Sequence, residues 1–461
     1  MNQPTAAGLS PAARRSMFGG AFMMFIDTFD IYLPAFILPA IIGYFIPKSL
    51  PASIQVTVST LIFTSTLLGR PLGGLIFGPL SDKYGRKRVA MLASAGFTAV
   101  TFVLSIMPGY AQWGYVSVVL FILLRFLDGI FLGGGYASAL PLALERSPIR
   151  MRGLVGGMMA ASAVLSVIAI NIIQYVLLLF ISRDEYTAWG WRLPFLVGVL
   201  LGVVYLFYYA GVPELEFKAL RGTHAKKQPL GELLGNRQHV RKAAILFLMM
   251  TGYWFSNQMA LSLLPSLMMG YLHVPASIFT KWAIVANVAV MIAVVAFGVL
   301  SQKIGRRRML MIFGVAITLS PFIYHTIVGY GKGAPNAVGM GVAISALMIV
   351  ASGSLGVVIT YLNECFPTRM RSTGYSLAYY LSVIVPGLYS FWLLGLQKFM
   401  PYEYTPLVLE CVGGLLFLLS AWAGPETRDV DLLAIAEGRA DAHETDSQRG
   451  EIKRMPGEVA R

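Results

Sequence analysis

Long apolar runs separated by short polar segments extend over most of the chain. A helix needs about 20 mostly apolar residues to cross the hydrocarbon core of a membrane. Twelve runs are long enough, and they lie near residues 18–46, 55–80, 89–108, 112–144, 153–182, 191–211, 241–272, 278–301, 308–329, 336–363, 372–398 and 404–424. We expect helix breaks at prolines inside these runs, because proline removes a backbone hydrogen bond. These prolines are Pro34, Pro39, Pro141, Pro265 and Pro386. The pattern predicts an all-α integral membrane protein with twelve transmembrane helices.

The composition agrees with this interpretation. Hydrophobic residues make up 56% of the 461 residues and charged residues only 13%, whereas soluble proteins have about 25% charged residues. Most of the 36 Lys and Arg residues lie in the tails and in the loops on the same side as the two termini. By the positive-inside rule, both termini are expected to be cytoplasmic, in a plasma membrane such as a bacterial inner membrane. The net charge of +14 is therefore interpreted as a topology signal and not as a surface for nucleic acid.

The residue inventory favours neither a metal site nor a disulfide. The two cysteines, Cys365 and Cys411, lie near or within runs of the second half, and the five histidines lack paired ligand spacing. We expect no cofactor apart from a proton as the coupling ion. No catalytic dyad or cofactor loop indicates an enzyme. The expected partners are the lipid bilayer and a small anionic substrate molecule, and the protein is expected to be a monomer.

Two loop sequences occur twice, about 220 residues apart. Residues 78–88, GPLSDKYGRKR, are echoed by residues 298–308, GVLSQKIGRRR. Residues 145–152, ERSPIRMR, are echoed by residues 364–371, ECFPTRMR. Several anchors repeated in one order indicate a duplicated structural unit.

The duplication predicts two pseudo-symmetric domains of six helices each, at residues 18–211 and 241–424. A cytoplasmic tail at 1–17 precedes them, and a cytoplasmic linker loop at 212–240 joins them. The last segment, 425–461, has mixed charge and few large apolar residues. We expect it to be a poorly ordered cytoplasmic tail.

Acidic residues inside the first predicted helix are the leading candidates for proton coupling. Asp27 and Asp30 share one helix face, because residues three apart are neighbours on a helix. A charge in the bilayer is costly unless it is paired, neutralised by a proton or hydrated, so both should face a cavity or an arginine. The alternative is a structural hydrogen bond to a neighbouring helix.

Two arginines inside predicted helices need an anionic partner, because arginine does not readily lose its charge. We expect Arg125 to pair with Asp27 or Asp30 and to be released on protonation, with a permanent pair to Asp128 as the alternative. Arg70 has no acidic neighbour in its own helix, so it is a candidate for binding a substrate carboxylate. Snorkelling, or a hydrogen bond to a neighbouring helix, is the alternative for Arg70.

The candidate substrate-binding residues also include polar and aromatic groups of the second half. The full set is Arg70, Arg125, Asp128, Tyr253, Asn257 and Tyr379. Aromatic packing is the alternative for the tyrosines. Glycine pairs four apart, such as Gly69 with Gly73 and Gly153 with Gly157, predict close helix packing.

The repeated basic loops are interpreted as latches that hold the cytoplasmic side shut. The residues assigned to this gating role are Gly78, Asp82, Gly85, Arg86, Lys87, Glu145 and Arg152 in the first half, and Gly305, Arg306, Glu364 and Arg371 in the second. Asp82 lies near a helix start, where a carboxylate interacts favourably with the helix dipole. Gln302 replaces it in the second copy, so we expect a weaker latch there. The alternative is that these loops are topology signals only.

These motifs resemble the major facilitator superfamily over nearly the whole chain. The run from Arg70 to Lys87, RPLGGLIFGPLSDKYGRK, is similar to the metabolite:proton symporter type, as are WGWRLPF at 189–195 and FPTRMRSTG at 366–374. The sequence of residues 27–30, DTFD, is also similar to that of lactate and sialate:proton symporters. The resemblance implies two six-helix domains with a substrate site midway between them and alternating access.

Two departures from relatives bear on the substrate. Residues 133–135 are three glycines where many relatives have G-G-E, so one carboxylate is missing. The Q-Q-x-x-G run of sugar porters is absent, which argues against a hexose.

The leading hypothesis is proton-coupled symport of a small organic acid. Proton-antiport efflux of drugs or waste metabolites is one alternative. Uptake of a zwitterionic osmolyte or amine is another, since two membrane carboxylates could bind a cation. A transporter-like sensor is disfavoured, because the short linker and plain tail indicate no signalling domain.

Overall fold

The computed structural model describes residues 11–430 apart from short gaps. The gaps are at 48, 51, 146, 212–230, 232, 234, 266, 269–271, 273, 275, 334–335 and 368–369. Most of the predicted linker and the predicted tail from residue 431 onward therefore lie outside the described residues. No strand occurs among the residues that are described, which confirms the all-α prediction.

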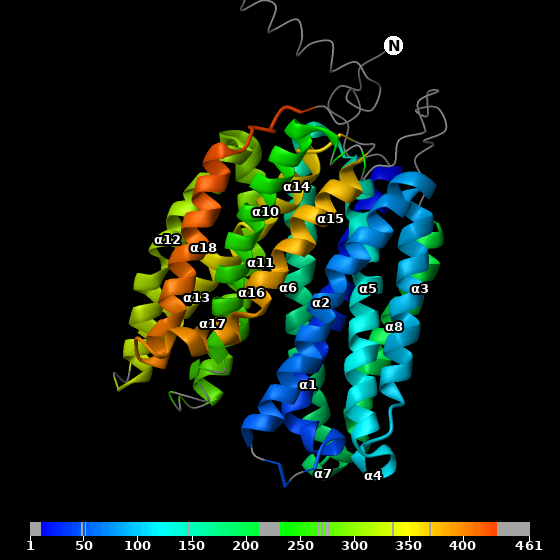
Figure 1. Ribbon diagram of the computed structural model, residues 1–461, viewed down its shortest axis with the longest axis vertical. Helices are drawn as coiled ribbons and strands as arrows, with labels where there is room; N and C mark the ends of the chain where they lie inside the picture. Colours follow the sequence, from blue (N-terminus) through cyan, green and yellow to red (C-terminus); the bar gives the residue numbers. More distant parts are fainter. Residues whose placement is uncertain are drawn as a thin grey trace, which may run out of the picture.

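Six long helices form the first half of the chain (Figure 1). They are α1 (Pro11–Phe45), α2 (Ala52–Tyr84), α3 (Arg86–Ser105), α5 (Tyr115–Glu145), α6 (Arg152–Phe180) and α8 (Arg192–Ala210). Short elements connect them: α4 (Tyr110–Trp113), the 3₁₀ turn η1 (Ile149–Met151), α7 (Arg183–Glu185) and the π turn η2 (Tyr186–Gly190). Helix α1 begins inside the segment predicted as a tail, where Pro11 occupies the first helical position that proline favours.

The second half contains more breaks. Its elements are α10 (Arg237–Asn257), the π segment η3 (Gln258–Leu263), α11 (Ala276–Ile304), α12 (Arg306–Gly331), α13 (Ala337–Gly353), α14 (Leu355–Glu364), α15 (Arg371–Tyr380), the 3₁₀ turn η6 (Leu381–Val383), α16 (Ile384–Gly387), α17 (Tyr389–Leu396), the 3₁₀ turn η7 (Tyr402–Tyr404) and α18 (Thr405–Ala423). Residues 237–240, predicted as linker, are the first turn of α10.

Ten helical segments among the described residues are long and apolar enough to cross a membrane. They match ten of the twelve predicted runs. The run predicted at 372–398 is divided among α15, η6, α16 and α17, and Pro386 lies in the short α16. The run predicted at 241–272 begins with charged residues and continues as π turns in η3.

Three of the other predicted break points, Pro34, Pro39 and Pro141, lie inside continuous helices, whereas Pro265 follows η3 next to residues outside the described part of the chain. Helix α1 continues through Pro34 and Pro39, and α5 continues through Pro141. The expectation of breaks there is wrong, because a long helix keeps its intact turns on both sides of a proline when neighbouring groups satisfy the freed backbone.

The two halves form neighbouring bundles that touch through α6, α11, α14, α2 and α15 (Figure 1). Helix α6 packs against α11 at glycines: an added Cβ on Gly153 would fall far inside contact distance of the Gly298 carbonyl oxygen, and the reverse also holds. The predicted close packing of Gly153 and Gly157 is confirmed, and it occurs between the halves. Gly69 and Gly73 instead bring α2 against α5 within the first half.

The two copies of the repeated loop have the same backbone shape. Gly85 has φ 106° and ψ 142°, and Gly305 has φ 105° and ψ 145°. Each glycine donates its N–H to the serine four residues earlier, Ser81 or Ser301, over 3.1 Å. Glycine is favoured at both positions because other residues rarely adopt such a positive φ.

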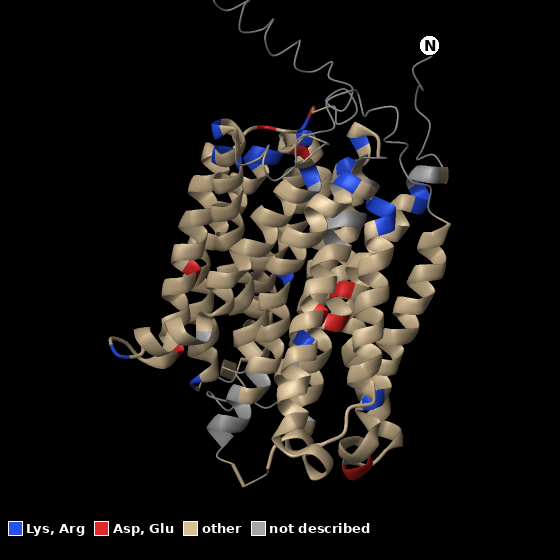
Figure 2. Ribbon diagram, turned by 45° about the vertical axis from the view of Figure 1, so that its right-hand side comes forward, with Lys and Arg blue, Asp and Glu red and all other residues tan. Residues whose placement is uncertain are grey.

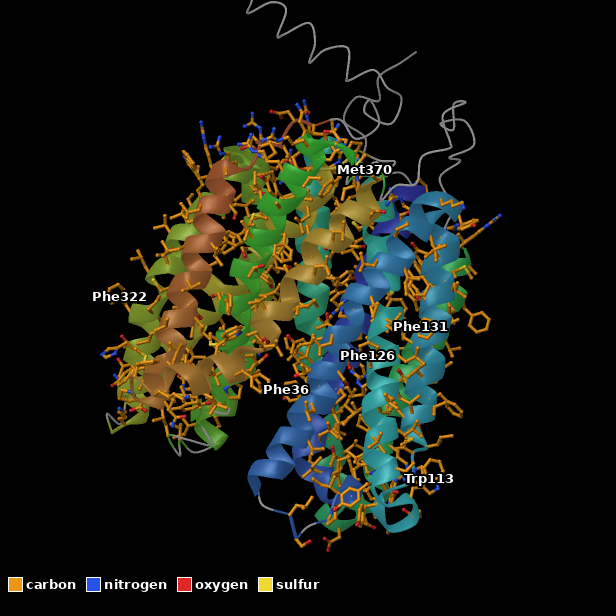
Figure 3. The ribbon with its side chains drawn as sticks, viewed as in Figure 1. Phe36, Trp113, Phe126, Phe131, Phe322 and Met370 are labelled. Atoms are coloured by element: carbon orange, nitrogen blue, oxygen red, sulfur yellow. The ribbon has the colours of Figure 1, made fainter. Side chains whose placement is uncertain are left out.

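Charge and exposed apolar surface have the arrangement expected of a membrane protein. Lys and Arg gather at the end of the bundles that holds the repeated loops, while acidic residues also occur midway along the helices (Figure 2). We call the former the basic end. Large apolar side chains project outward from the bundles, as Phe322 does from α12, where it is 74% exposed (Figure 3).

Candidate functional site

A cavity of about 90 Å³ lies between the two halves. It is lined by α1, α2 and α6 from the first half and by α10, η3, α11, α13, α14 and α15 from the second. Its volume is below the roughly 300–1,000 Å³ of most ligand pockets. The walls are therefore close together in this conformation. Among the described residues that line it, Asp27 and Arg70 are the charged ones.

Asp27 and Arg70 form a buried ion pair across helices α1 and α2. Nη2 of Arg70 donates to both carboxylate oxygens of Asp27, at 3.0 Å and 2.8 Å. The two side chains are only 7% and 3% exposed. The Tyr380 ring of α15 lies 5.0 Å from the guanidinium carbon and extends the contact into the second half. Arg70, which has no acidic neighbour in its own helix, thus has an acidic partner on α1.

A second charged cluster lies outside the cavity lining. Nη1 of Arg125 donates to Asp30 Oδ2 at 2.9 Å and to Asp128 Oδ2 at 2.7 Å. Thr101 donates to the other Asp30 oxygen at 2.9 Å. The pairing of Arg125 with Asp30 matches one of the two predicted partners, and the alternative pair with Asp128 is present as well. With both carboxylates ionised, the cluster has one negative charge in excess.

Helix α10 and η3 supply a polar and aromatic wall. Asn257 donates to the Tyr253 hydroxyl at 3.4 Å and to Ser352 at 3.1 Å. The Trp254 indole N–H donates to the Tyr379 carbonyl at 3.2 Å, and the two rings meet edge to face at 5.3 Å. Of the predicted substrate residues, Arg70, Tyr253, Asn257 and Tyr379 line the cavity, whereas Arg125 and Asp128 do not.

The gating residues of the first half lie at the basic end. Arg86 is buried after Gly85, and Lys87 donates to the Ala210 carbonyl at 2.6 Å, which joins α3 to the end of α8. Gly78 lies within α2, buried, ahead of that loop. The side chains of Asp82 and Glu145 lie outside the described part of the chain, so their predicted latch contacts are not observed.

The corresponding residues of the second half form a dense hydrogen-bond network. Arg306 contacts Glu364 through Nε and Nη2, both at 3.3 Å. It also donates to Ser301 at 2.6 Å and to Gln302 at 2.6 Å. Arg371 donates through Nε to the Phe366 carbonyl at 3.2 Å. The side-chain oxygen of Gln302 therefore accepts a hydrogen bond in this network. The predicted difference in strength between the two latches stays a prediction.

The segment Pro425–Val430 packs against both halves at this end. Glu426 accepts the Arg306 backbone N–H at 2.8 Å, where a carboxylate at a helix N-terminus is favourable. Thr427 donates to Glu364 at 2.7 Å. Arg152 of the first half donates to the Val430 carbonyl at 2.7 Å. These contacts satisfy the polar groups of the first six residues of the segment predicted as a poorly ordered tail, and the rest of that segment lies outside the described residues.

Sequence reasoning also missed a buried acid of the second half. Glu410 is the acidic residue of α18, and it is fully buried. A lone carboxyl group in an apolar run is the same signal that identified Asp27 and Asp30. It was available in the predicted run at 404–424.

Comparisons with known proteins agree with this architecture. The chain is 25% identical over 448 residues to the proline/betaine transporter of Salmonella typhimurium, covering 92% of this chain and 86% of that protein. It is 26% identical over 458 residues to the glycine betaine/proline/ectoine/pipecolic acid transporter OusA of Dickeya dadantii, covering 94% and 87%. The solved structure of the proton:xylose symporter XylE bound to 6-bromo-6-deoxy-D-glucose superposes with a TM-score of 0.76 at 16% identity, covering 91% of this chain and 98% of that one.

The family assignment rests on a match of residues 20–389 to the family model of the Major Facilitator Superfamily. That match includes the cavity, both charged clusters and both repeated loops. The predicted resemblance is confirmed: the chain belongs to the Major Facilitator Superfamily and is a multi-pass membrane transporter rather than an enzyme.

Proposed function

We propose that the protein takes up a small zwitterion, carrying a carboxylate and an ammonium group, by proton-coupled symport. The observation that carries this proposal is the charge of the cavity. Its described charged lining residues, Asp27 and Arg70, have opposite signs and sum to zero. A zwitterion also has zero net charge, and its two ends match the two members of the pair.

Binding would proceed by exchange of partners within this pair. The substrate carboxylate would accept hydrogen bonds from Arg70, because a guanidinium matches a carboxylate in geometry and charge. The substrate ammonium would lie against Asp27 and the aromatic wall formed by Tyr253, Trp254 and Tyr379. Aromatic faces attract quaternary and secondary ammonium groups, by up to about 2 kcal/mol where water is excluded.

An organic acid, the leading hypothesis from sequence, fits this cavity less well. A simple anion would leave one buried negative charge unless Asp27 took up a proton at the same moment. It would also gain nothing from the aromatic wall. The similarity to transporters named for proline and betaine supports the zwitterion, which was the alternative hypothesis.

The proton would bind at the cluster of Asp30, Arg125 and Asp128. Two carboxylates share one guanidinium there, at 2.9 Å and 2.7 Å, and all three side chains are at most 3% exposed. One added proton makes the cluster neutral, and a buried excess charge is costly without it. Asp30 lies one helical turn from Asp27 on α1, so protonation could shift α1 and alter the Asp27 site.

Alternating access would move the halves relative to each other about the cavity. In this conformation they touch at the basic end, which the positive-inside rule assigns to the cytoplasm. The cavity would then be approached from the opposite side before the halves rock. In a bacterial cell the membrane would be the inner membrane, with both termini cytoplasmic.

Uptake by purified protein in proteoliposomes tests this proposal. With an imposed inward proton gradient, we expect accumulation of radiolabelled betaine and proline, and competition by other zwitterions of similar size. The double variant Asp27→Asn/Arg70→Gln, which keeps the cavity neutral, should abolish uptake. Equal or faster uptake of a carboxylate without an ammonium group would overturn the zwitterion assignment. Uptake that does not depend on the proton gradient would overturn the proposed coupling.

A further inference from the structure

Glu410 lies within a membrane-crossing helix and has no charged partner in the described part of the chain. It is the sixth residue of α18, within the membrane-crossing segment Tyr402–Ala423, and its exposed fraction is 0%. At 1.5 Å per residue it lies roughly 8 Å from the start of that helix. It belongs neither to the cavity lining nor to the charged cluster around Arg125.

The hydrogen bonds of Glu410 are all to neutral groups. Its Oε2 accepts the Ser256 hydroxyl of α10 at 2.8 Å and lies 2.8 Å from the Ser320 hydroxyl of α12, which is also 2.7 Å from the Ile317 carbonyl oxygen. Its Oε1 is buried and has no hydrogen-bond partner among the described residues. The carboxyl group therefore connects α10, α12 and α18 through Oε2, whereas Oε1 makes no hydrogen bond to the described residues.

The surrounding elements bring tyrosines towards this group rather than cations. Tyr324 of α12 interacts electrostatically with Glu410, and its own buried hydroxyl has no hydrogen-bond partner among the described residues. Tyr389 of α17 and Tyr402 of η7 are the next titratable groups around Tyr324. His325 of α12 stacks on Tyr404, and Lys332, the residue after α12, pairs with Glu403. The charged residues of α10 and α12 lie in the first turns of those helices, at Arg237–Lys242 and Arg306–Arg308.

A buried carboxylate with neutral neighbours is costly, because two serine hydroxyls replace little of the hydration that the charge loses. A proton on Oε2 removes that cost, because it can be donated to the Ser320 oxygen while the Ser320 hydrogen goes to the Ile317 carbonyl at 2.7 Å. We propose that Glu410 is a second proton-binding site, separate from the Asp30–Arg125–Asp128 cluster, and that it is filled in this conformation. The reaction is the simple addition of H⁺ to a carboxylate to give a carboxylic acid.

The site is connected to the cavity through α10. Ser256, which donates to Glu410, precedes Asn257 in the chain and follows Tyr253 by three residues, and both of those line the cavity. Loss of the proton would place a charge between α10, α12 and α18 and weaken their packing. The occupancy of this site would thus control the position of the cavity wall.

Infrared spectroscopy of the full-length protein in lipid tests the site directly, without any substrate. We expect a carbonyl band of a buried protonated carboxylic acid near neutral pH that disappears in Glu410→Gln. The matched control is Glu403→Gln, which removes an acid of the same half that pairs with Lys332. The control should keep the band. A spectrum of Glu410→Gln with the same carbonyl intensity as wild type would overturn the proposal, whereas a weaker band that remains in both proteins belongs to another buried acid.

The pH dependence of thermal stability gives an independent test. A proton held by the folded state and lost on unfolding makes stability fall as pH rises, by up to about tenfold in the folding equilibrium per pH unit. Glu410→Gln mimics the protonated acid, so its stability should fall less than that of wild type or Glu403→Gln as pH rises from the ordinary titration range of a glutamate through neutral pH. Equal pH dependence in all three would overturn the proposal, as would stabilisation of wild type by sodium ions at alkaline pH. Because neither test uses a substrate, failure here is distinguishable from failure of the proposed transport function.

Discussion

Removing one member of the cavity ion pair should destabilise the protein more than removing both. Arg70 and Asp27 are 2.8 Å apart, with side chains only 7% and 3% exposed. Deleting one partner of such a pair typically costs about 3–5 kcal/mol, whereas replacing both by neutral groups is often close to neutral. The Tyr380 ring, 5.0 Å from the guanidinium, offsets about 1 kcal/mol of the cost in Asp27→Asn. We therefore expect Asp27→Asn to be less stable than Asp27→Asn/Arg70→Gln by about 2–4 kcal/mol.

Thermal unfolding of the purified variants measures this difference. The surface pair of Arg428 and Asp429 is the matched control, because the two side chains are 40% and 76% exposed. Exposed pairs contribute about 0–1 kcal/mol, so Asp429→Asn should melt close to wild type. If Asp27→Asn melts at or above the temperature of the double variant, Arg70 does not depend on Asp27, and the reasoning about the cavity charge is refuted.

Three further predictions concern the interface, the wall and the proton cluster. Gly153→Ala should shift the protein towards conformations open at the basic end by about 5- to 150-fold, since overpacking costs about 1–3 kcal/mol. Spin-label distances between α6 and α11 measure the shift, and Gly329→Ala, where a Cβ meets open space, should leave them unchanged. Trp254→Ala should weaken betaine binding about 3- to 30-fold in a titration, and Trp254→Phe should bind with an intermediate affinity. Equal affinity of Trp254→Ala and wild type would exclude a contact between the ammonium group and this ring. Asp128→Asn should keep substrate exchange but lose roughly tenfold in accumulation for each unit of imposed pH gradient; undiminished accumulation would place the proton elsewhere.

The sequence predicts the repeated architecture well, because the conformation of each repeated loop depends on residues that are close together in the chain. Gly85 and Gly305 each follow a helix and precede another, and a glycine with positive φ is a property of those few residues. The same holds for the Arg125–Asp128 pair, whose spacing on one helix already brings the two groups together. Apolar runs likewise define most of the membrane-crossing helices.

Partners on different helices could not be predicted in the same way. The sequence leaves open which aspartate of α1 pairs with which arginine. The rotation of α1 against α2 and α5 decides that Arg70 pairs with Asp27 and Arg125 with Asp30. The docking of Pro425–Val430 depends on helix ends that are more than 50 residues away in the chain. The division of the run at 372–398 into short helices has no comparable local signal beyond Pro386.

The zero net charge of the cavity has an electrical consequence. If the bound substrate is neutral and the Asp27–Arg70 pair is neutral, each transport cycle carries only the charge of its proton across the membrane. Uptake would then be electrogenic, with an inward current that rises with substrate concentration. A membrane potential of 100 mV contributes about 2.3 kcal/mol per charge, enough for roughly 50-fold accumulation in the absence of any pH difference. A protein built in this way would concentrate its substrate from voltage alone.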